Sequence, residues 1–374
     1  MKTLEETVAE YGYPFDPSII ANEPASPRDS AKLLVYRRDT GPHFAKGFAG
    51  QGPFFDTFAN IGKYLPKGAV LILNDTKVFP ARLHVAKKTG GRVEVFYVGE
   101  KDGNILAITN HFLDVGEKVF LTSDIYFECL GKEDKIYTLR PSFPMGDVQK
   151  IFQKFGETPI PPYIKNTKLS ETQLREKYQT VFAKKTGSVA APTASLHFTK
   201  RLLAKLKKQG IQIEFVTLHV NLGTFAPLTE EALKTGKLHK EWYEIPEKTA
   251  KALVKAKQEG RPIIAVGTTA VRTLEEWAEN TAIGKKFGGR TSRGRNDLQI
   301  FSQSLTSGET RLFIRPGYKF KFVDGMITNF HVPKSSLLML VAAFVGREKL
   351  FELYGEAMKK DFRFFSFGDG MLLL

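Results

Sequence analysis

The sequence predicts an α/β fold: a mixed, mostly parallel sheet with flanking helices, interrupted by a small β-barrel domain. From residue 199 to 280, apolar strands alternate with amphipathic helices, an order typical of parallel sheets. Between residues 91 and 141 the pattern changes to short strands of alternating polarity separated by turn residues. We therefore expect a discontinuous α/β catalytic domain, residues 1–83 and 142–374, with an inserted β-barrel domain, residues 84–141.

The first predicted strand is the apolar run VLIL, residues 70–73, which the turn residues Asn74 and Asp75 close. The barrel strands follow as RVEVFYV, NILAIT, EKVFLT, IYFECLG and KIYTLR. Apolar residues then recur at helical spacing from Val148 to Phe155, and Gly156 ends that helix.

The second half of the chain alternates helices and strands. Ser170 and Gln173 form a capping-box pattern, and Pro246 has the character of a first helical residue. The remaining predicted elements are a basic helix from Thr199 to Gly210, a strand over 213–220, a helix ending at Gly260, a strand over 262–266 and a helix over 270–280.

Composition limits the class of protein. The single cysteine, Cys129, excludes an internal disulfide and a multi-cysteine zinc site. The longest apolar run, Leu337 to Val345, is too short to cross a bilayer, and the N-terminus lacks the apolar stretch of a secretory signal. We expect a cytoplasmic protein, a monomer, with no membrane partner.

The charge balance favours a polyanionic partner. There are 55 Lys and Arg residues against 40 Asp and Glu, a net charge of +15. Nucleic acid is the obvious candidate, although many basic proteins bind none. Residues 284–295, GKKFGGRTSRGR, contain five basic residues and no acidic ones. This segment is either a loop that follows phosphates or an unstructured surface insertion.

The turn from Gly267 into the following helix is a candidate anion site. Free backbone N–H groups and the helix dipole favour a carboxylate or phosphate there, and Arg272 lies in the first turn. Thr268 and Thr269 add hydroxyl groups. The alternative is an ordinary strand-to-helix turn with threonine caps.

The segment GSVAAPTASLHFT, residues 187–199, is small, apolar and rich in hydroxyl groups. Ser188, Thr193 and Ser195 could hydrogen-bond a flat ligand, and His197 could act as an acid or base near neutral pH. A lone histidine is more often a satisfied core residue, so both interpretations stay open. The same holds for His331.

Other motifs carry less information. No histidine has a second ligand at a recognised metal spacing, so we expect no metal. Asp75 and Asp369 lie among turn residues, where a carboxylate often serves its own backbone. The dinucleotide-binding, P-loop and nucleophile-elbow motifs are all missing from the sequence.

Nine segments, in order, resemble one family, the S-adenosylmethionine:tRNA ribosyltransferase-isomerases of the queuosine pathway. They cover most of the chain: PRDSAKLLV (27–35), LNDTKVFPARL (73–83), TGGRVEVF (89–96), PIPPYI (159–164), residues 178–199, TLHVNLGTFAPL (217–228), AVGTTAVRTLE (265–275), residues 315–346 and FRFFSFGDGMLL (362–373).

The resemblance implies an enzyme that transfers and isomerises the ribosyl group of S-adenosylmethionine onto 7-aminomethyl-7-deazaguanine at the wobble position of tRNA. The product is epoxyqueuosine, and adenine and methionine leave. S-adenosylmethionine is then a co-substrate, no cofactor is needed, and the RNA partner is the anticodon region.

The resemblance also suggests site residues, carried over position by position. The catalytic candidates are His197, Asp75, His331 and Asp369. The substrate-binding candidates are Ser188, Thr193, Ser195, Gly223, Thr224, Thr268, Thr269, Arg272 and Asn329.

Three positions depart from the family pattern. Ser195 and Asn221 stand where glycine is usual, and Gly236 stands where a histidine is expected. Asparagine tolerates positive φ better than most residues, so the turn at Asn221 can survive. These departures leave open a paralogue with a different acceptor, or a tRNA-binding relative without catalysis.

Overall fold

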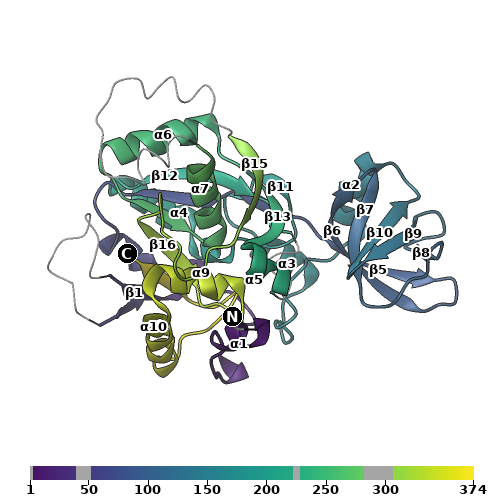
Figure 1. Ribbon diagram of the computed structural model, residues 1–374, viewed down its shortest axis with the longest axis horizontal. Helices are drawn as coiled ribbons and strands as arrows, with labels where there is room; N and C mark the ends of the chain where they lie inside the picture. The colour runs from purple at the N-terminus through teal and green to yellow at the C-terminus, as the bar shows by residue number, and fades with distance from the viewer. Residues whose placement is uncertain (1–2, 39–51, 222–227, 282–305) are drawn as a thin grey trace.

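The computed structural model describes residues 3–38, 52–221, 228–281 and 306–374. A mixed sheet with helices on both faces forms the body, and a closed barrel stands to one side of it (Figure 1). The expected fold class, an α/β body interrupted by a small barrel, is confirmed. Residues 284–295 lie outside the described residues.

Nine strands build the central sheet. Their order is β15 (Ser307–Leu312), β13 (Lys237–Glu244), β12 (Gln212–Leu218), β3 (Val70–Asn74), β14 (Ile263–Val266), β16 (Gly325–Asn329), β17 (Gly370–Leu373), β1 (Lys32–Tyr36) and β2 (Phe54–Thr57). The four central strands β12, β3, β14 and β16 are parallel. Pairing is antiparallel on both sides of this group, so the sheet is mixed.

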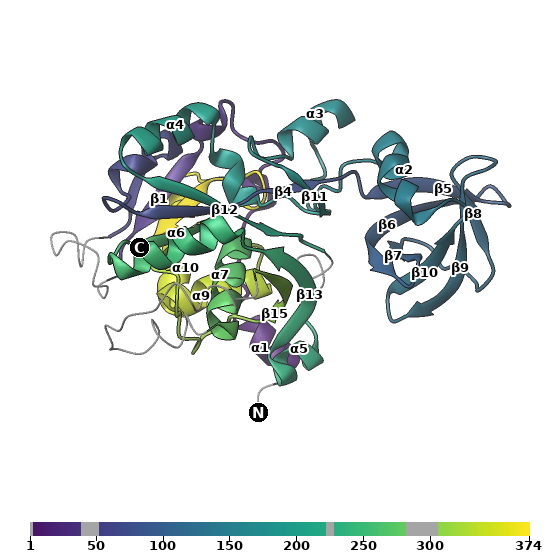
Figure 2. The ribbon, with the colours of Figure 1, turned by 90° about the horizontal axis from the view of Figure 1, so that it is seen from above.

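Helices cover both faces of the sheet, and Figure 2 shows α4 on one side with α6 and α7 on the other. The body helices are α1 (Leu4–Ala9), α3 (Glu171–Lys177), α4 (Lys200–Lys208), α5 (Glu230–Thr235), α6 (Glu247–Gln258), α7 (Thr268–Asn280), α9 (Ser336–Val345) and α10 (Arg347–Lys359). Short 3₁₀ helices lie at Pro17–Ile19, Arg28–Ser30, Phe58–Lys63, Met145–Asp147 and Thr193–His197. No helix in the described part of the chain is long and apolar enough to cross a membrane.

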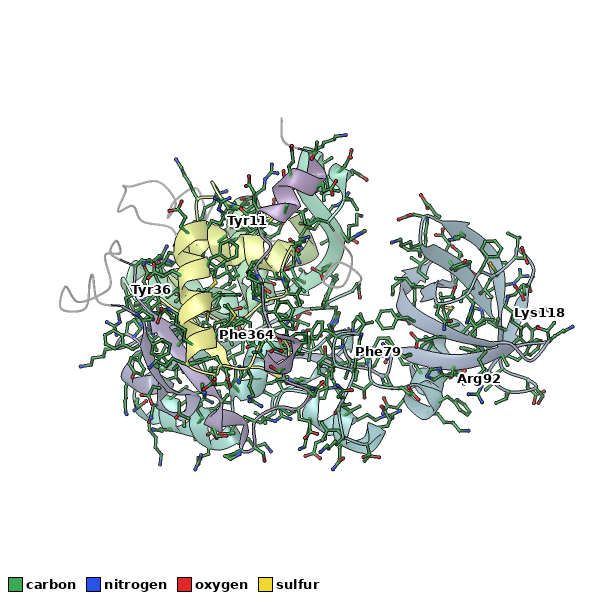
Figure 3. The ribbon with its side chains drawn as sticks, turned by 90° about the horizontal axis from the view of Figure 1, so that it is seen from below. Tyr11, Tyr36, Phe79, Arg92, Lys118 and Phe364 are labelled. Atoms are coloured by element: carbon green, nitrogen blue, oxygen red, sulfur yellow. The ribbon has the colours of Figure 1, made fainter. Side chains whose placement is uncertain are left out.

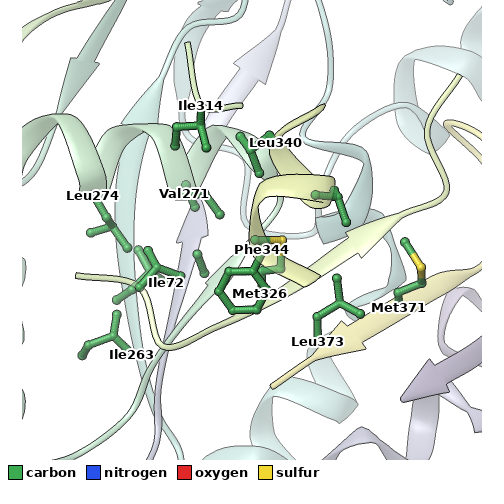
Figure 4. Close-up of a cluster of buried hydrophobic side chains, with 14 of the residues drawn as sticks. Ile72, Ile263, Val271, Leu274, Ile314, Met326, Leu340, Phe344, Met371 and Leu373 are labelled. Carbon is green, nitrogen blue, oxygen red and sulfur yellow. The ribbon is translucent and has the colours of Figure 1, made fainter. Parts of the chain in front are cut away.

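The larger core lies between the sheet and helices α6, α7, α9 and α10. Figure 4 shows Ile72, Val271 and Met326 meeting there from β3, α7 and β16. All three side chains are fully buried. Burial of one such side chain stabilises the fold by about 1.5–3 kcal/mol, so this core holds α7 firmly against the strand ends.

The barrel closes in the order β10 (Ile136–Pro141), β7 (Asn104–Thr109), β6 (Arg92–Lys101), β5 (Arg82–Lys87), β8 (Lys118–Phe120) and β9 (Tyr126–Glu133). Helix α2 (Val148–Phe155) contributes Phe152 to the barrel core. Phe79, which packs edge-on against Phe152 and Tyr97, marks the junction with the body (Figure 3). A small parallel pair, β4 (Thr76–Val78) and β11 (Lys185–Ser188), lies between the barrel and the sheet.

The local sequence signals agree closely with these elements. Helix α2 ends at Gly156, and Ser170 and Gln173 form the predicted capping box. Pro246 differs by one position: it is the N-cap of α6 rather than its first residue. The division into domains at residues 84 and 141 stays a prediction.

Candidate active site at the carboxyl ends of the central strands

The central parallel strands end at one edge of the sheet, where ligands bind in open α/β folds. Residues that follow three of these strands line a cavity there: Val220 after β12, Gly267 after β14 and Phe330 after β16. The cavity holds ≈ 100 Å³ of space accessible to water, and ≈ 840 Å³ when its open mouth is included. Its lining includes the predicted site residues Thr193, Thr268, Thr269, Arg272, Asn329 and His331.

Arg272 forms a buried ion pair with Glu241. The guanidinium Nη1 contacts Glu241 Oε2, and Nε donates to the carbonyl of Leu312 at 3.0 Å. The Arg272 and Glu241 side chains are only 8% and 1% exposed. Nη2 is buried and has no hydrogen-bond partner among the described residues. An unsatisfied buried donor is costly, so Nη2 is a strong candidate to bind a ligand oxygen.

The N-terminus of α7 supplies further donors. Gly267 adopts φ 85° before the helix, which begins at Thr268, and the first N–H groups of a helix have no partner within it. Thr269 Oγ1 accepts a hydrogen bond from Asn74 Nδ2 at 3.3 Å. Asn74 also exchanges hydrogen bonds with the backbone of Leu218, so one amide ties β3, β12 and α7 together.

Asn329 lines the cavity, and its hydrogen bonds determine the orientation of its side-chain amide. Nδ2 donates to the carbonyl oxygens of Phe365 and Ser366, at 3.0 and 3.2 Å. Oδ1 therefore faces His197, whose Nε2 is the donor at 2.9 Å. Burial lowers the pKa of His197 to about 4, against the opposing effect of the Asn329 hydrogen bond. His197 is thus a neutral donor that orients Asn329.

His331 is the histidine that lines the cavity. Its Nε2 lies 2.8 Å from Thr328 Oγ1, and its backbone N–H donates to the hydroxyl of Tyr354. Burial lowers the pKa of His331 to about 4. The imidazole is therefore neutral near pH 7 and can exchange a proton with a ligand.

Aromatic rings form another wall of the cavity. Tyr163 packs against Phe365 with ring centroids 5.1 Å apart, and its hydroxyl lies 2.5 Å from Ser366 Oγ. Burial raises the pKa of Tyr163 to about 12, so the phenol stays protonated at neutral pH. Flat, apolar surfaces of this kind suit a planar ligand such as a nucleobase.

Five predicted site residues are absent from the cavity lining, and two of them are carboxylates. Asp75 accepts from Thr217 Oγ1 at 2.6 Å, and burial raises the pKa of its carboxyl. Asp369 accepts the backbone N–H groups of Lys32 and Arg363 at 3.0 and 2.7 Å.

Two of the other three are serines. Ser188 Oγ donates to the carbonyl of Ala190 and accepts the N–H of Val220, bracing two chain segments. Ser195 Oγ is buried with no partner among the described residues. His197 is likewise absent from the lining, because it lies behind Asn329. Their role as site residues stays a prediction.

The positions that depart from the family pattern also lie off the cavity lining. Asn221 has a negative φ, so the turn does not need a residue that tolerates positive φ. The backbone N–H of Asn221 donates to Glu241 Oε1 at 3.4 Å. Gly236 is the left-handed C-cap of α5 at φ 66°. Gly223 and Thr224 lie outside the described residues.

A second cavity, with ≈ 680 Å³ of space accessible to water, lies between the barrel and the body. Barrel residues such as Arg82 and Phe96 face Ile160 and His239 across it. It is larger than the strand-end cavity, but none of the predicted site residues lines it. Over the described ranges no cluster of three or more His, Cys, Asp or Glu side chains could hold a metal ion.

Sequence reasoning missed several residues of the site. Glu241 was not singled out, because its partner Arg272 is 31 positions away and only the pairing of β13 beside α7 brings them together. Tyr163 and Phe365 were also missed, although both lie in segments that carry the family resemblance. A family motif without an assigned role was the signal available for these two.

The fold and the cavity define a class: a two-lobed α/β protein with a polar cavity at the strand ends. The model of the family described as "Queuosine biosynthesis protein" matches residues 8–373. This chain belongs to that family.

Individual relatives align with this chain over nearly their whole length. The S-adenosylmethionine:tRNA ribosyltransferase-isomerase of Thermotoga maritima is 42% identical over 371 residues, covering 98% of this chain and 99% of that protein. The enzyme of the same name from Carboxydothermus hydrogenoformans is 40% identical over 369 residues, with the same coverage. A crystal structure of S-adenosylmethionine tRNA ribosyltransferase from Thermotoga maritima aligns with TM-score 0.52 and 31% identity, over 98% of this chain and 100% of that one.

Proposed function

We propose that this chain transfers and isomerises the ribosyl group of S-adenosylmethionine onto 7-aminomethyl-7-deazaguanine at the wobble position of tRNA. Epoxyqueuosine forms in the tRNA, and adenine and methionine leave. Relatives of that name, at about 40% identity over 98% of the chain, support the assignment. The single structural observation that carries it is the unpartnered Nη2 of Arg272, a residue that lines a cavity with an aromatic wall.

Arg272 and the N-terminus of α7 suit the carboxylate of the methionine part. Because Glu241 neutralises Arg272, the site offers directed donors with little net charge. A carboxylate that carries its own ammonium partner fits this better than a doubly charged phosphate does. The wall of Tyr163 and Phe365 then faces the planar part of a substrate.

The chemistry needs a base for the C5′ proton, which the adjacent sulfonium makes acidic, and an acid that helps adenine leave. The neutral imidazole of His331 is the candidate in the cavity wall for moving a proton. Asn329 offers the second lone pair of Oδ1 to a donor on the substrate, since His197 occupies the first. His197, which donates to Asn329 Oδ1, acts through that amide as a positioning residue. Asp75 and Asp369 hold the surrounding chain, through Thr217 and through backbone N–H groups.

The decisive experiment measures adenine release from S-adenosylmethionine by purified protein, with and without tRNA carrying the aminomethyl-deazaguanine. Nucleoside mass analysis of the tRNA follows. Release that requires the tRNA, together with an epoxycyclopentane-bearing nucleoside, is the expected result. Adenine release without that tRNA would favour a paralogue with a different acceptor. Tight tRNA binding without adenine release would favour a non-catalytic relative. The cytoplasmic location and the monomeric state stay predictions.

A further inference from the structure

Two hydroxyl groups that the proposed chemistry does not use meet in the wall of the strand-end cavity. Tyr163 Oη lies 2.5 Å from Ser366 Oγ, and both residues line the cavity. One proton of the pair lies in this hydrogen bond, whichever hydroxyl donates it. The other proton has no acceptor among the described residues. The pair therefore has one O–H left to donate to a ligand.

Both hydroxyl groups keep their protons near neutral pH. Burial raises the pKa of Tyr163 to about 12, and hydrogen bonds from the hydroxyl and the backbone N–H of Ser366 only partly offset this effect. Each hydroxyl oxygen also has lone pairs, so the pair can accept a hydrogen bond as well as donate one. It is a neutral group with adjacent donor and acceptor functions.

The backbone that carries Ser366 is held in an unusual conformation. Phe365 has φ 71°, a left-handed value that bulky residues rarely adopt. Its N–H donates to the carbonyl of Phe330 at 3.1 Å, and its carbonyl accepts from Gly368 N–H and Asn329 Nδ2, both at 3.0 Å. Strained backbone of this kind persists only where the surrounding structure enforces it, and it is concentrated at functional sites. The turn therefore fixes the position of Ser366 before any ligand arrives.

The surroundings of the pair favour a planar, uncharged partner. The ring of Tyr163 packs against that of Phe365, with centroids 5.1 Å apart. Arg272 is the only described lining residue with a full charge, and Glu241 neutralises it. Enzymes that act on a base hold it between aromatic or apolar side chains and hydrogen-bond its edge. Adenine has an amino group beside N7, and a deazaguanine has N1–H beside O6, so either edge matches a donor–acceptor pair.

We propose that the Tyr163–Ser366 hydroxyl pair recognises the edge of a purine-type base that lies against the aromatic wall. The pair donates one hydrogen bond to an acceptor atom of the base and accepts one from the neighbouring N–H. This inference rests on the proposed function, which supplies two such bases: the adenine of S-adenosylmethionine and the 7-aminomethyl-7-deazaguanine of tRNA. The two substrates share the chemistry of recognition, and their KM values distinguish them.

Ser366→Ala and Tyr163→Phe each remove one hydroxyl of the pair. In an adenine-release assay, we expect each variant to raise KM roughly five- to tenfold for one substrate only, as for the loss of one neutral hydrogen bond. A rise for S-adenosylmethionine assigns the pair to adenine. A rise for an anticodon stem–loop RNA carrying the deazaguanine assigns it to that base. Tyr97→Phe, which loses a hydroxyl that donates to Glu100 on the barrel, is the matched control and should change neither KM.

Substrate analogues test the same contact from the other side. For adenine, N1 or N7 of S-adenosylmethionine is replaced in turn by C–H. For the deazaguanine, the stem–loop carries a base without O6. We expect one of these changes to raise KM in the wild type and to cause no further rise in Ser366→Ala, because the variant has already lost the hydrogen bond.

Unchanged KM values for both substrates in Ser366→Ala and Tyr163→Phe would overturn the inference. An equal rise in both KM values would also overturn it, since the hydroxyl pair would then only support the fold of the cavity wall. Independent, additive effects of every analogue and of Ser366→Ala would have the same meaning. If the wild type releases no adenine, the proposed function itself is wrong. Normal release by the wild type, with normal KM values in both variants, would remove only the base-recognition role.

Discussion

Arg272 on helix α7 and Glu241 on strand β13 form an ion pair that is more than nine-tenths buried on both sides. Two of the three guanidinium nitrogens are used, by Glu241 and by the Leu312 carbonyl, and the third has no partner among the described residues. Burying both charges is costly, and the Coulomb attraction only partly offsets that cost. A ligand atom that accepts a hydrogen bond from Nη2 would give the third guanidinium nitrogen its partner.

Arg272→Lys tests whether this third nitrogen binds substrate. Lysine keeps the charge opposite Glu241 but has no planar fork, so it cannot serve Glu241, Leu312 and a ligand together. We expect KM for S-adenosylmethionine to rise by about tenfold or more, as for the loss of one charge-assisted hydrogen bond. Steady-state adenine release measures this. Lys251→Arg, on the exposed face of α6, is the control. An unchanged KM would mean that Nη2 does not contact the substrate.

Glu241→Gln tests the electrostatic role of the pair. Glutamine has one acceptor oxygen, so it loses the contact with either Arg272 or the backbone N–H of Asn221. The positive charge of Arg272 is then no longer balanced. We expect a lower melting temperature without ligand and a larger rise on adding S-adenosylmethionine than in the wild type. Differential scanning calorimetry measures the melting temperature of the wild type and of Glu241→Gln, each with and without S-adenosylmethionine. Equal ligand-induced shifts would contradict the argument.

His331→Gln tests proton transfer in the cavity. Glutamine can still hydrogen-bond Thr328, but it cannot take up and release a proton. We expect kcat to fall by about 10²-fold or more, with a small change in KM for either substrate. Thr328→Val is the companion variant, because it removes the hydroxyl that orients the ring. A normal kcat in His331→Gln would exclude His331 as the acid or base.

Acidification should destabilise the protein through its buried histidines. Burial lowers the pKa of His197 and of His331 from 6.5 to about 4, so the unfolded chain binds protons more readily than the folded one. Their contribution to stability is complete above pH 6.5 and is lost as the pH falls toward 4. Each unit of pKa shift corresponds to about 1.4 kcal/mol. Melting temperatures from pH 7.5 to 4.5 should decline less in His197→Gln.

Asp369→Asn should affect stability rather than binding. The carboxylate accepts the N–H groups of Lys32 and Arg363, one on each oxygen, and the amide of asparagine can accept only one of them. A buried donor without a partner costs about 1–3 kcal/mol. We expect a clear loss of stability in urea with KM unchanged. Asp361→Asn, at an exposed position nearby, is the control. A KM effect without destabilisation would return Asp369 to the catalytic residues.

Local patterns in the sequence determined most elements of this fold. The capping box at Ser170 and the stop at Gly156 depend on neighbours within a few residues, so they are legible in the sequence itself. The strand of residues 70–73 and the turn at Gly267 are equally local signals. Several segments that carry the family resemblance line the cavity.

Only the tertiary structure decided which residues of those segments line the cavity. His197 and Asn329 stand 132 positions apart, and their contact turns the histidine away from the cavity. The carboxylates of Asp75 and Asp369 are taken up by Thr217 and by distant backbone N–H groups. Buried polar groups must find partners, and those partners come from strands and helices that meet only in the folded chain. The sequence alone could therefore identify the chemistry-bearing segments, but the packing between elements determined which residues lie at the cavity and which support it.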